Sequence, residues 1–319
     1  MQLKNNNKKT FKKVPKVHQK PMPWQHPKPE EEEPAARERI EAIMHHSNYI
    51  QADRDPDFLR RDEVRAVRLE VDYLKAELLL KEHGIEHTIV VFGSTRIVES
   101  SEIKRHIKIL KESLSNESDN EELEKELRIA ENLLAKSHYY DTARRFGSIV
   151  GRSGKGPDDA RVTLMTGGGP GIMEAVNRGA FDVGAKSIGL NITLPHEQYP
   201  NPYITPELCF QFHYFAIRKM HFLRRAEALV IFPGGFGTMD ESFEILTLVQ
   251  TRKIDPIPII FVGESYWKNM VNFEGFMEEG VIDPEDMDVF TFVETAEEAW
   301  ETILRWHRDS GSALAKVLA

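Results

Sequence analysis

Several features are scarce in this sequence of 319 residues. Cys209 is the only cysteine, which excludes an intramolecular disulfide and a zinc site built from several cysteines. The longest apolar runs, such as Ala228 to Phe232, are far too short to span a bilayer. The N-terminus carries lysines but lacks the apolar segment of a secretory signal. We therefore expect no membrane partner and a cytoplasmic location.

Charge is unevenly distributed along the chain. The whole sequence has 42 basic and 51 acidic residues, a net charge of -9, which argues against general nucleic-acid binding. Eight lysines, from Lys4 to Lys28, nevertheless precede the first acidic residue, Glu30. This segment is also rich in Pro, Asn and Gln, and it buries too little apolar surface to offset its ordering entropy. Residues 1–35 are therefore predicted to form a flexible, solvated basic arm.

The hydrophobic pattern changes along the chain. Residues 36–86 show helical spacing, with a long helix expected from Phe58 to a stop at Gly84. Residues 99–137 are strongly charged around a polar centre and predict an inserted helical hairpin. The rest of 87–319 alternates hydrophobic strands with helices. This alternation predicts an α/β fold, a Rossmann-like doubly wound parallel sheet with helices on both faces.

A first glycine turn, TGGGPGIME (Thr166 to Glu174), follows a hydrophobic strand and opens a helix. The N-terminus of a helix has unpaired N–H groups and partial positive charge, so the turn is a candidate anion site. A dinucleotide fingerprint would need glycine in place of Ile172, and the Gly-Lys-Ser/Thr ending of a P-loop is missing. An NAD site and an ATPase are thus disfavoured. Close packing of helix on strand is the other explanation of these glycines.

A second glycine turn, PGGFGTMDE (Pro233 to Glu241), repeats the arrangement after the strand EALVIF. Its glycines, Gly234, Gly235 and Gly237, can present backbone N–H groups to a phosphate. Thr238 can add a hydroxyl or cap the helix that begins there. Two such turns in one sheet rarely arise by accident.

A third, polar turn ends the first strand at Gly93 to Arg96. It could supply Ser94 and Arg96 to the same ligand, or it could be an ordinary helix cap with a surface arginine. Ser94 has no G-x-S-x-G context, which leaves a hydrolase triad unsupported. His213 and His221 lack metal-ligand spacing, so we expect no metal.

The helix FAIRKMHFLRR places Arg218, His221 and Arg225 on one face, opposite an apolar face. A basic face alone is most often solvated, but this one leads directly into the strand before the second turn. Glu241 lies one turn beyond the glycines of that turn. Acids are common in first helical turns, yet a carboxylate beside a phosphoribosyl group could orient water or stabilise positive charge on the sugar.

These motifs resemble the Lonely Guy (LOG) family, whose hallmark is P-G-G-x-G-T-x-x-E preceded by an Arg-Lys pair on a helix. The resemblance covers about Thr88 to Arg308, with the charged hairpin as an insertion, and the hallmark is highly specific. Related sequences were long labelled possible lysine decarboxylases. No pyridoxal-phosphate lysine motif is visible here, so nothing supports that chemistry.

The resemblance implies that 87–319 is a nucleotide-binding catalytic domain that hydrolyses a nucleoside 5′-monophosphate to free base and ribose 5-phosphate. The catalytic arginine and glutamate fall on Arg218 and Glu241. The substrate-binding positions that we assign are Ser94, Arg96, Gly168, Gly169, Gly171, Glu174, Lys219, Gly235, Gly237 and Thr238. No cofactor is required, and a homodimer with its site near the subunit interface is implied. Plant-type members usually have a small residue where Glu174 stands, so a cytokinin precursor, AMP and a pyrimidine nucleotide all stay open as substrates.

Two other kinds of function stay open. One is a nucleotide or molybdenum-cofactor carrier, which would bind its ligand without turning it over, although a pure carrier has no need of both Arg218 and Glu241. The other is a nucleic-acid accessory protein that acts through the basic arm. Its binding would weaken steeply with salt and disappear without residues 1–35.

Overall fold

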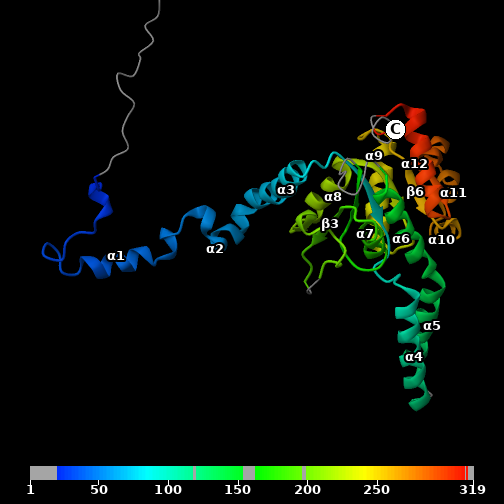
Figure 1. Cartoon of the computed structure of the whole chain (residues 1–319), viewed down its shortest axis with the longest axis horizontal. Coiled ribbons are helices and arrows are strands. Elements are labelled where there is room, and N and C mark those ends of the chain that lie inside the picture. Colours follow the sequence, from blue (N-terminus) through cyan, green and yellow to red (C-terminus); the bar gives the residue numbers. More distant parts are fainter. Residues whose placement is uncertain (1–19, 118–119, 154–161, 196–198, 313, 315–319) are drawn as a thin grey trace, which may run out of the picture. The chain divides into compact units, whose positions relative to one another are not determined.

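The computed structural model describes residues 20–117, 120–153, 162–195, 199–312 and 314 (Figure 1). The chain divides into two compact units, residues 1–65 and residues 66–319. The helical region expected at 36–86 is therefore shared between them. The first 19 residues, which hold most of the predicted basic arm, lie outside the described residues. None of the helices in the described ranges is long and apolar enough to cross a membrane.

The first unit consists of short helices with little buried surface. They are η1 (Pro23–Gln25), α1 (Ala36–Met44), η2 (Ser47–Tyr49), η3 (Ala52–Arg54), α2 (Pro56–Arg60) and η4 (Asp62–Val64). Asp55 caps α2 by accepting hydrogen bonds from the amides of Asp57 and Phe58. Arg61 is extended and ends this helix, and the long helix α3 begins only at Arg65. The expectation of one continuous helix from Phe58 is therefore wrong over its first turns.

Seven parallel strands form one sheet in the second unit. In chain order they are β1 (His87–Phe92), β2 (Val162–Thr166), β3 (Ser187–Ile192), β4 (Cys209–Phe212), β5 (Ala226–Ile231), β6 (Ile259–Val262) and β7 (Phe290–Val293). Their order across the sheet is β4-β3-β2-β1-β5-β6-β7, with every neighbouring pair parallel. The direction of winding reverses at β1, which lies between β2 and β5.

Helices cover both faces of the sheet and create two hydrophobic cores. One face carries α3 (Arg65–Glu82), α8 (Phe215–Arg224), α9 (Phe236–Gln250), α10 (Glu264–Met270) and α11 (Phe273–Glu278). The other carries α6 (His138–Gly151), α7 (Ile172–Phe181) and α12 (Ala296–Ser310). Short 3-10 helices, η5 (Pro206–Leu208) and η6 (Pro284–Val289), precede β4 and β7. Val90 of β1 faces the first core and its neighbour Val91 the second, as strand geometry requires. The predicted doubly wound fold is confirmed.

The charged insertion is a pair of helices, α4 (Ser100–Asn116) and α5 (Glu121–Lys136), that extends away from the sheet (Figure 1). The pair has a small core of its own, formed by Ile103, Ile107, Leu110 and Ala130. Leu133, near the end of α5, packs against both this core and the core shared by α6, α7 and α12. The predicted helical hairpin is confirmed, and its end nearest the sheet is anchored.

Candidate functional site

All three polar turns meet at one edge of the sheet. β1, β2 and β5 are neighbours, and their carboxyl ends lead into Gly93, Gly167 and Phe232 respectively. Ligands of open α/β sheets bind at this edge, where the direction of winding reverses. The topology therefore brings together segments that are far apart in the sequence.

Backbone hydrogen bonds tie the three turns to one another. Ser94 donates its amide to the carbonyl of Pro233 (2.9 Å) and accepts from the amide of Ile172 (3.0 Å). A Cβ on Gly171 would collide with the Ser94 carbonyl, and one on Gly93 would overlap Ile172. Gly93 and Gly171 are therefore needed for close approach of the turns. The Ser94 hydroxyl accepts from the Arg96 amide (3.1 Å), while Arg96 itself is exposed.

Buried side-chain amides hold the first glycine turn. Gly168 has a φ of +72°, and a Cβ there would collide with Asn191. Asn201 donates its backbone N–H to the Gly168 carbonyl (2.9 Å) and its side-chain N–H to the Gly169 carbonyl (3.0 Å). The amides of Gly169 and Gly171 meet no acceptor among the described residues. With its carbonyls occupied and these amides spare, the turn is prepared for an anion.

The second glycine turn is more open. A Cβ on Gly235 or Gly237 would meet no atom within 4 Å. The Gly234 carbonyl accepts from the hydroxyl of Tyr266 (2.9 Å), and the amides of Gly234 and Gly235 donate to nothing in the described part of the chain. Helix α9 begins at Phe236, so Thr238 lies inside its first turn rather than capping it. Thr238 is buried and packs against Gly234.

The basic face of α8 points inward, which reverses the usual arrangement of an amphipathic helix. Arg218 and His221 are buried, whereas Met220 on the opposite face is 54% exposed. The expectation that such a face is solvated does not apply here because α3 supplies partners for it. Arg225 pairs with Glu77 (2.9 Å), and His221 contacts the Tyr73 carbonyl (3.1 Å). Burial lowers the pKa of His221, so its ring is neutral at pH 7.

Arg218 and Glu241 face one another between the two glycine turns. Nη2 of Arg218 donates to Oε1 of Glu241 at 3.4 Å. A Cβ on Gly167 would lie 2.7 Å from the same Nη2, so the guanidinium rests against the first turn. Nε of Arg218 is buried and has no hydrogen-bond partner within the described residues. A buried donor left unpaired costs about 1–3 kcal/mol, which a ligand that accepts from it can recover.

Glu241 is the carboxyl group at this site whose pKa is shifted most from its ordinary value. Its side chain is 17% exposed, and burial raises its pKa to about 7 although Arg218 acts to lower it. Burial also lowers the pKa of Arg218. A buried carboxyl that titrates near neutral pH beside a buried arginine is a candidate acid–base group.

Two predicted binding residues have other partners in the structure. Lys219 pairs with Asp240 (2.8 Å) and Glu244 (3.1 Å), both on α9. Glu174 accepts a hydrogen bond from the hydroxyl of Tyr140 (3.0 Å) on α6. The structure thus ties Lys219 to the helix that carries Glu241 and ties Glu174 to the packing of α6 on α7. Contact of either residue with a ligand stays a prediction.

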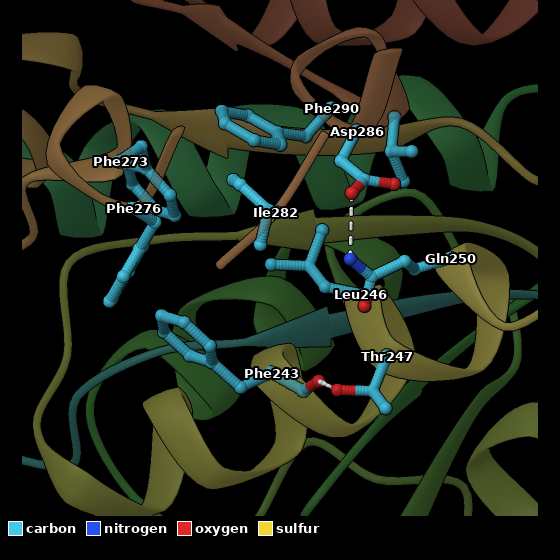
Figure 2. A pocket seen from close by; sticks show the side chains of 10 residues that line it. Phe243, Leu246, Thr247, Gln250, Phe273, Phe276, Ile282, Asp286 and Phe290 are labelled. Atoms are coloured by element: carbon cyan, nitrogen blue, oxygen red, sulfur yellow. Dashed lines mark hydrogen bonds between the residues drawn. The ribbon is translucent and has the colours of Figure 1, made fainter. Parts of the chain in front are cut away.

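Two hollows flank the second turn and α9, and they differ in character. One, about 220 Å³, is lined by Ser94, Gly234, Gly235 and Tyr266, together with residues of α5. The other, about 210 Å³, lies between α9 and the segment from α11 to β7, and four phenylalanines line it (Figure 2). Its charged lining residue is Asp286, which accepts from Gln250 (2.7 Å). Only the first hollow suits an anion, because it has spare amides and no carboxylate in its lining.

Sequence reasoning missed the polar network behind the first turn. Thr166 donates to Asn177 (2.8 Å), which in turn donates to Ser187 (2.9 Å) and accepts from Asn201 (3.0 Å). All four side chains are buried. An asparagine in the otherwise apolar face of a helix, as in AVNRGA, was the available signal, since a buried amide needs partners.

Comparisons with known proteins find similarity over the part of the chain that carries this site. A family model described as possible lysine decarboxylase matches residues 173–303, which include Arg218 and Glu241. The cytokinin riboside 5′-monophosphate phosphoribohydrolase LOG3 of Arabidopsis thaliana is 29% identical, over 51% of this chain and 73% of its own length. LOG1 of the same plant is 28% identical, over 51% of this chain and 74% of its own length.

Solved structures with a similar arrangement include the molybdenum cofactor carrier protein of Chlamydomonas reinhardtii, at 16% identity. The match covers 69% of this chain and 99% of that one, with a TM-score of 0.39. The molybdenum cofactor binding protein of Rippkaea orientalis matches at 17% identity, over 52% of this chain and 85% of its own, with a TM-score of 0.35. The family model, the phosphoribohydrolase relatives and the hallmark PGGFGTMDE all make this chain similar to the Lonely Guy (LOG) family.

Proposed function

We propose that this protein hydrolyses the N-glycosidic bond of a nucleoside 5′-monophosphate, releasing the free base and ribose 5-phosphate. The observation that carries the proposal is the buried Arg218–Glu241 pair, placed between two turns that have spare amides. The names of the relatives, which are phosphoribohydrolases of cytokinin riboside 5′-monophosphate, support the same reaction.

The phosphate would bind at the second turn. Gly234 and Gly235 offer unpaired amides next to the N-terminus of α9, a helix of 15 residues. Gly235 is open to approach because a ligand oxygen there meets no side chain. The ribose would then lie toward Glu241, which follows Gly235 by six residues and so lies nearly two turns along α9.

Cleavage of a glycosidic bond passes through an oxocarbenium-like sugar. As a carboxylate, Glu241 stabilises that positive charge and takes a proton from the attacking water. The water oxygen bonds to C1′ as the bond from C1′ to the base nitrogen breaks. The base leaves with the bonding electrons and takes up the proton that Glu241 removed from the water. A pKa near 7 suits this proton transfer, which is typically worth ~10²–10⁴ in rate.

Arg218 would hold the sugar. Its Nη2 already contacts Glu241, and the unpaired Nε can donate to a ribose hydroxyl. One planar guanidinium would thus fix both the carboxylate and the substrate. We propose AMP or a cytokinin riboside 5′-monophosphate as the substrate and a homodimer as the working assembly.

The test is incubation with a panel of nucleoside 5′-monophosphates, with release of ribose 5-phosphate as the readout. We expect turnover by the native chain and its loss in Glu241→Gln and Arg218→Ala, with circular dichroism unchanged. If the native chain binds a nucleotide but releases no product across the whole panel, it is a carrier and the proposal is wrong.

A further inference from the structure

We propose that Lys136, at the end of the inserted hairpin, binds the 5′-phosphate of the substrate together with the second glycine turn. This inference rests on the proposed function and adds a substrate-positioning residue from a segment that the glycine motifs do not include. It gives the insertion a role in distinguishing phosphorylated substrates from free nucleosides.

The geometry of one cavity carries the inference. The hollow of about 220 Å³ beside the second turn has two walls. One wall is formed by the turns at the sheet edge, with Ser94, Pro233, Gly234 and Gly235, and by Tyr266 of α10. The other wall is formed by α5, which contributes Ile129, Asn132, Leu133 and Lys136. The insertion therefore closes one side of the space in which the spare amides of the turn lie.

The lining of this cavity selects for an anion. Lys136 is the one charged residue in the lining, and the lining includes no carboxylate. The other donors are the Ser94 hydroxyl, the Asn132 side-chain amide and the amides of Gly234 and Gly235, whereas the Tyr266 hydroxyl already donates to the Gly234 carbonyl. Hydrogen-bond donors around a single cation match the three acceptor oxygens of a phosphate monoester.

The fold holds Lys136 at this position. Leu133, one turn before it on α5, packs into both the hairpin core and the core of the sheet. Ser137, the next residue, is buried and ends the helix by donating its hydroxyl to the Leu134 carbonyl (2.8 Å). The end of α5 is therefore fixed against the sheet and not free to swing with the outer part of the hairpin.

The ammonium group can serve a ligand without losing its present contact. Nζ of Lys136 donates to the Asn132 carbonyl of its own helix at 3.1 Å. An ammonium has three N–H donors, so at least one remains for a phosphate oxygen. Lys125, also on α5 but exposed and outside the cavity lining, has the same charge without this position and is a matched control.

The experiment measures nucleotide affinity in the absence of turnover. Calorimetry with AMP and with adenosine compares Glu241→Gln with the double variants that add Lys136→Ala, Lys136→Arg or Lys125→Ala. We expect Lys136→Ala to weaken AMP binding about tenfold, as for loss of one charge-assisted hydrogen bond. Adenosine affinity should not change, Lys136→Arg should restore most of the AMP affinity, and Lys125→Ala should have no effect.

Two outcomes would overturn the inference. Equal AMP affinity in the Lys136→Ala and Lys125→Ala variants removes any role for Lys136. A parallel loss of AMP and adenosine affinity shows a structural effect of the substitution instead of a phosphate contact. Turnover by the native chain tests the proposed function separately, because the binding comparison does not depend on catalysis.

Discussion

Replacing Glu241 with glutamine should destroy activity and at the same time stabilise the fold at alkaline pH. The carboxyl group has a pKa of 4.5 as its ordinary value and about 7 in the folded protein, where burial disfavours the charged form. Because the folded state holds its proton more tightly than the unfolded state, the native protein loses stability as pH rises from about 4.5 to about 7.

The size of the effect follows from the same pKa values. A rise from 4.5 to about 7 corresponds to about 3 kcal/mol, since one pKa unit is worth about 1.4 kcal/mol. Glutamine has the shape of the neutral acid and carries no ionisation cost. Glu241→Gln should therefore be more stable than the native chain by up to about 3 kcal/mol at pH 8, and equally stable below about pH 4.5.

Urea unfolding at pH 5 and at pH 8 measures this difference, with the fluorescence of the fully buried Trp267 as a reporter of the sheet unit. Glu112, which is 65% exposed on α4, provides a control. Glu112→Gln should change stability by less than about 1 kcal/mol at either pH. If Glu241→Gln is no more stable than the native chain at pH 8, burial does not destabilise the charged form of Glu241 and the reasoning is wrong.

Three further predictions concern the same site. Gly168→Ala should lower the free energy of unfolding in urea by more than about 1 kcal/mol, because φ is +72° there and the added methyl meets Asn191. Gly235→Ala should keep its stability but raise KM for a nucleotide, since its methyl occupies open space where the phosphate would lie. Arg218→Lys should retain the fold yet lower kcat at least about tenfold, because an ammonium group cannot hold Glu241 and the ribose in one plane. An unchanged kcat would contradict the proposed role of the Arg218–Glu241 pair in catalysis. The rate at saturating AMP should rise with pH through about 7 and then level off, because the carboxylate is the active form of Glu241. A rate that falls over the same range would make the protonated acid the active form.

The local elements of the fold could be predicted from the sequence. Glycine turns between a hydrophobic strand and a helix are visible in the chain itself, because a strand repeats every two residues and a helix every 3.6. The hallmark PGGFGTMDE likewise placed Glu241 near the spare amides of its own turn, a distance of a few residues along one helix. The insertion was also evident, since its charge and its polar centre interrupt the α/β alternation.

The tertiary structure decided which face of α8 is buried. The spacing of residues in a helix defines two faces, but it does not show which face is covered by another segment. Here α3, about 150 residues earlier in the chain, covers the basic face of α8 with Glu77 and the Tyr73 carbonyl. Arg218, on the same inward face of α8, lies against Glu241 of α9, and burial moves the pKa of that carboxyl to about 7. Burial is a property of the packed chain, so the chemistry of Glu241 could not be read from its neighbours in sequence. The sequence determined where the turns and the carboxylate lie, and long-range packing decided how that carboxylate titrates.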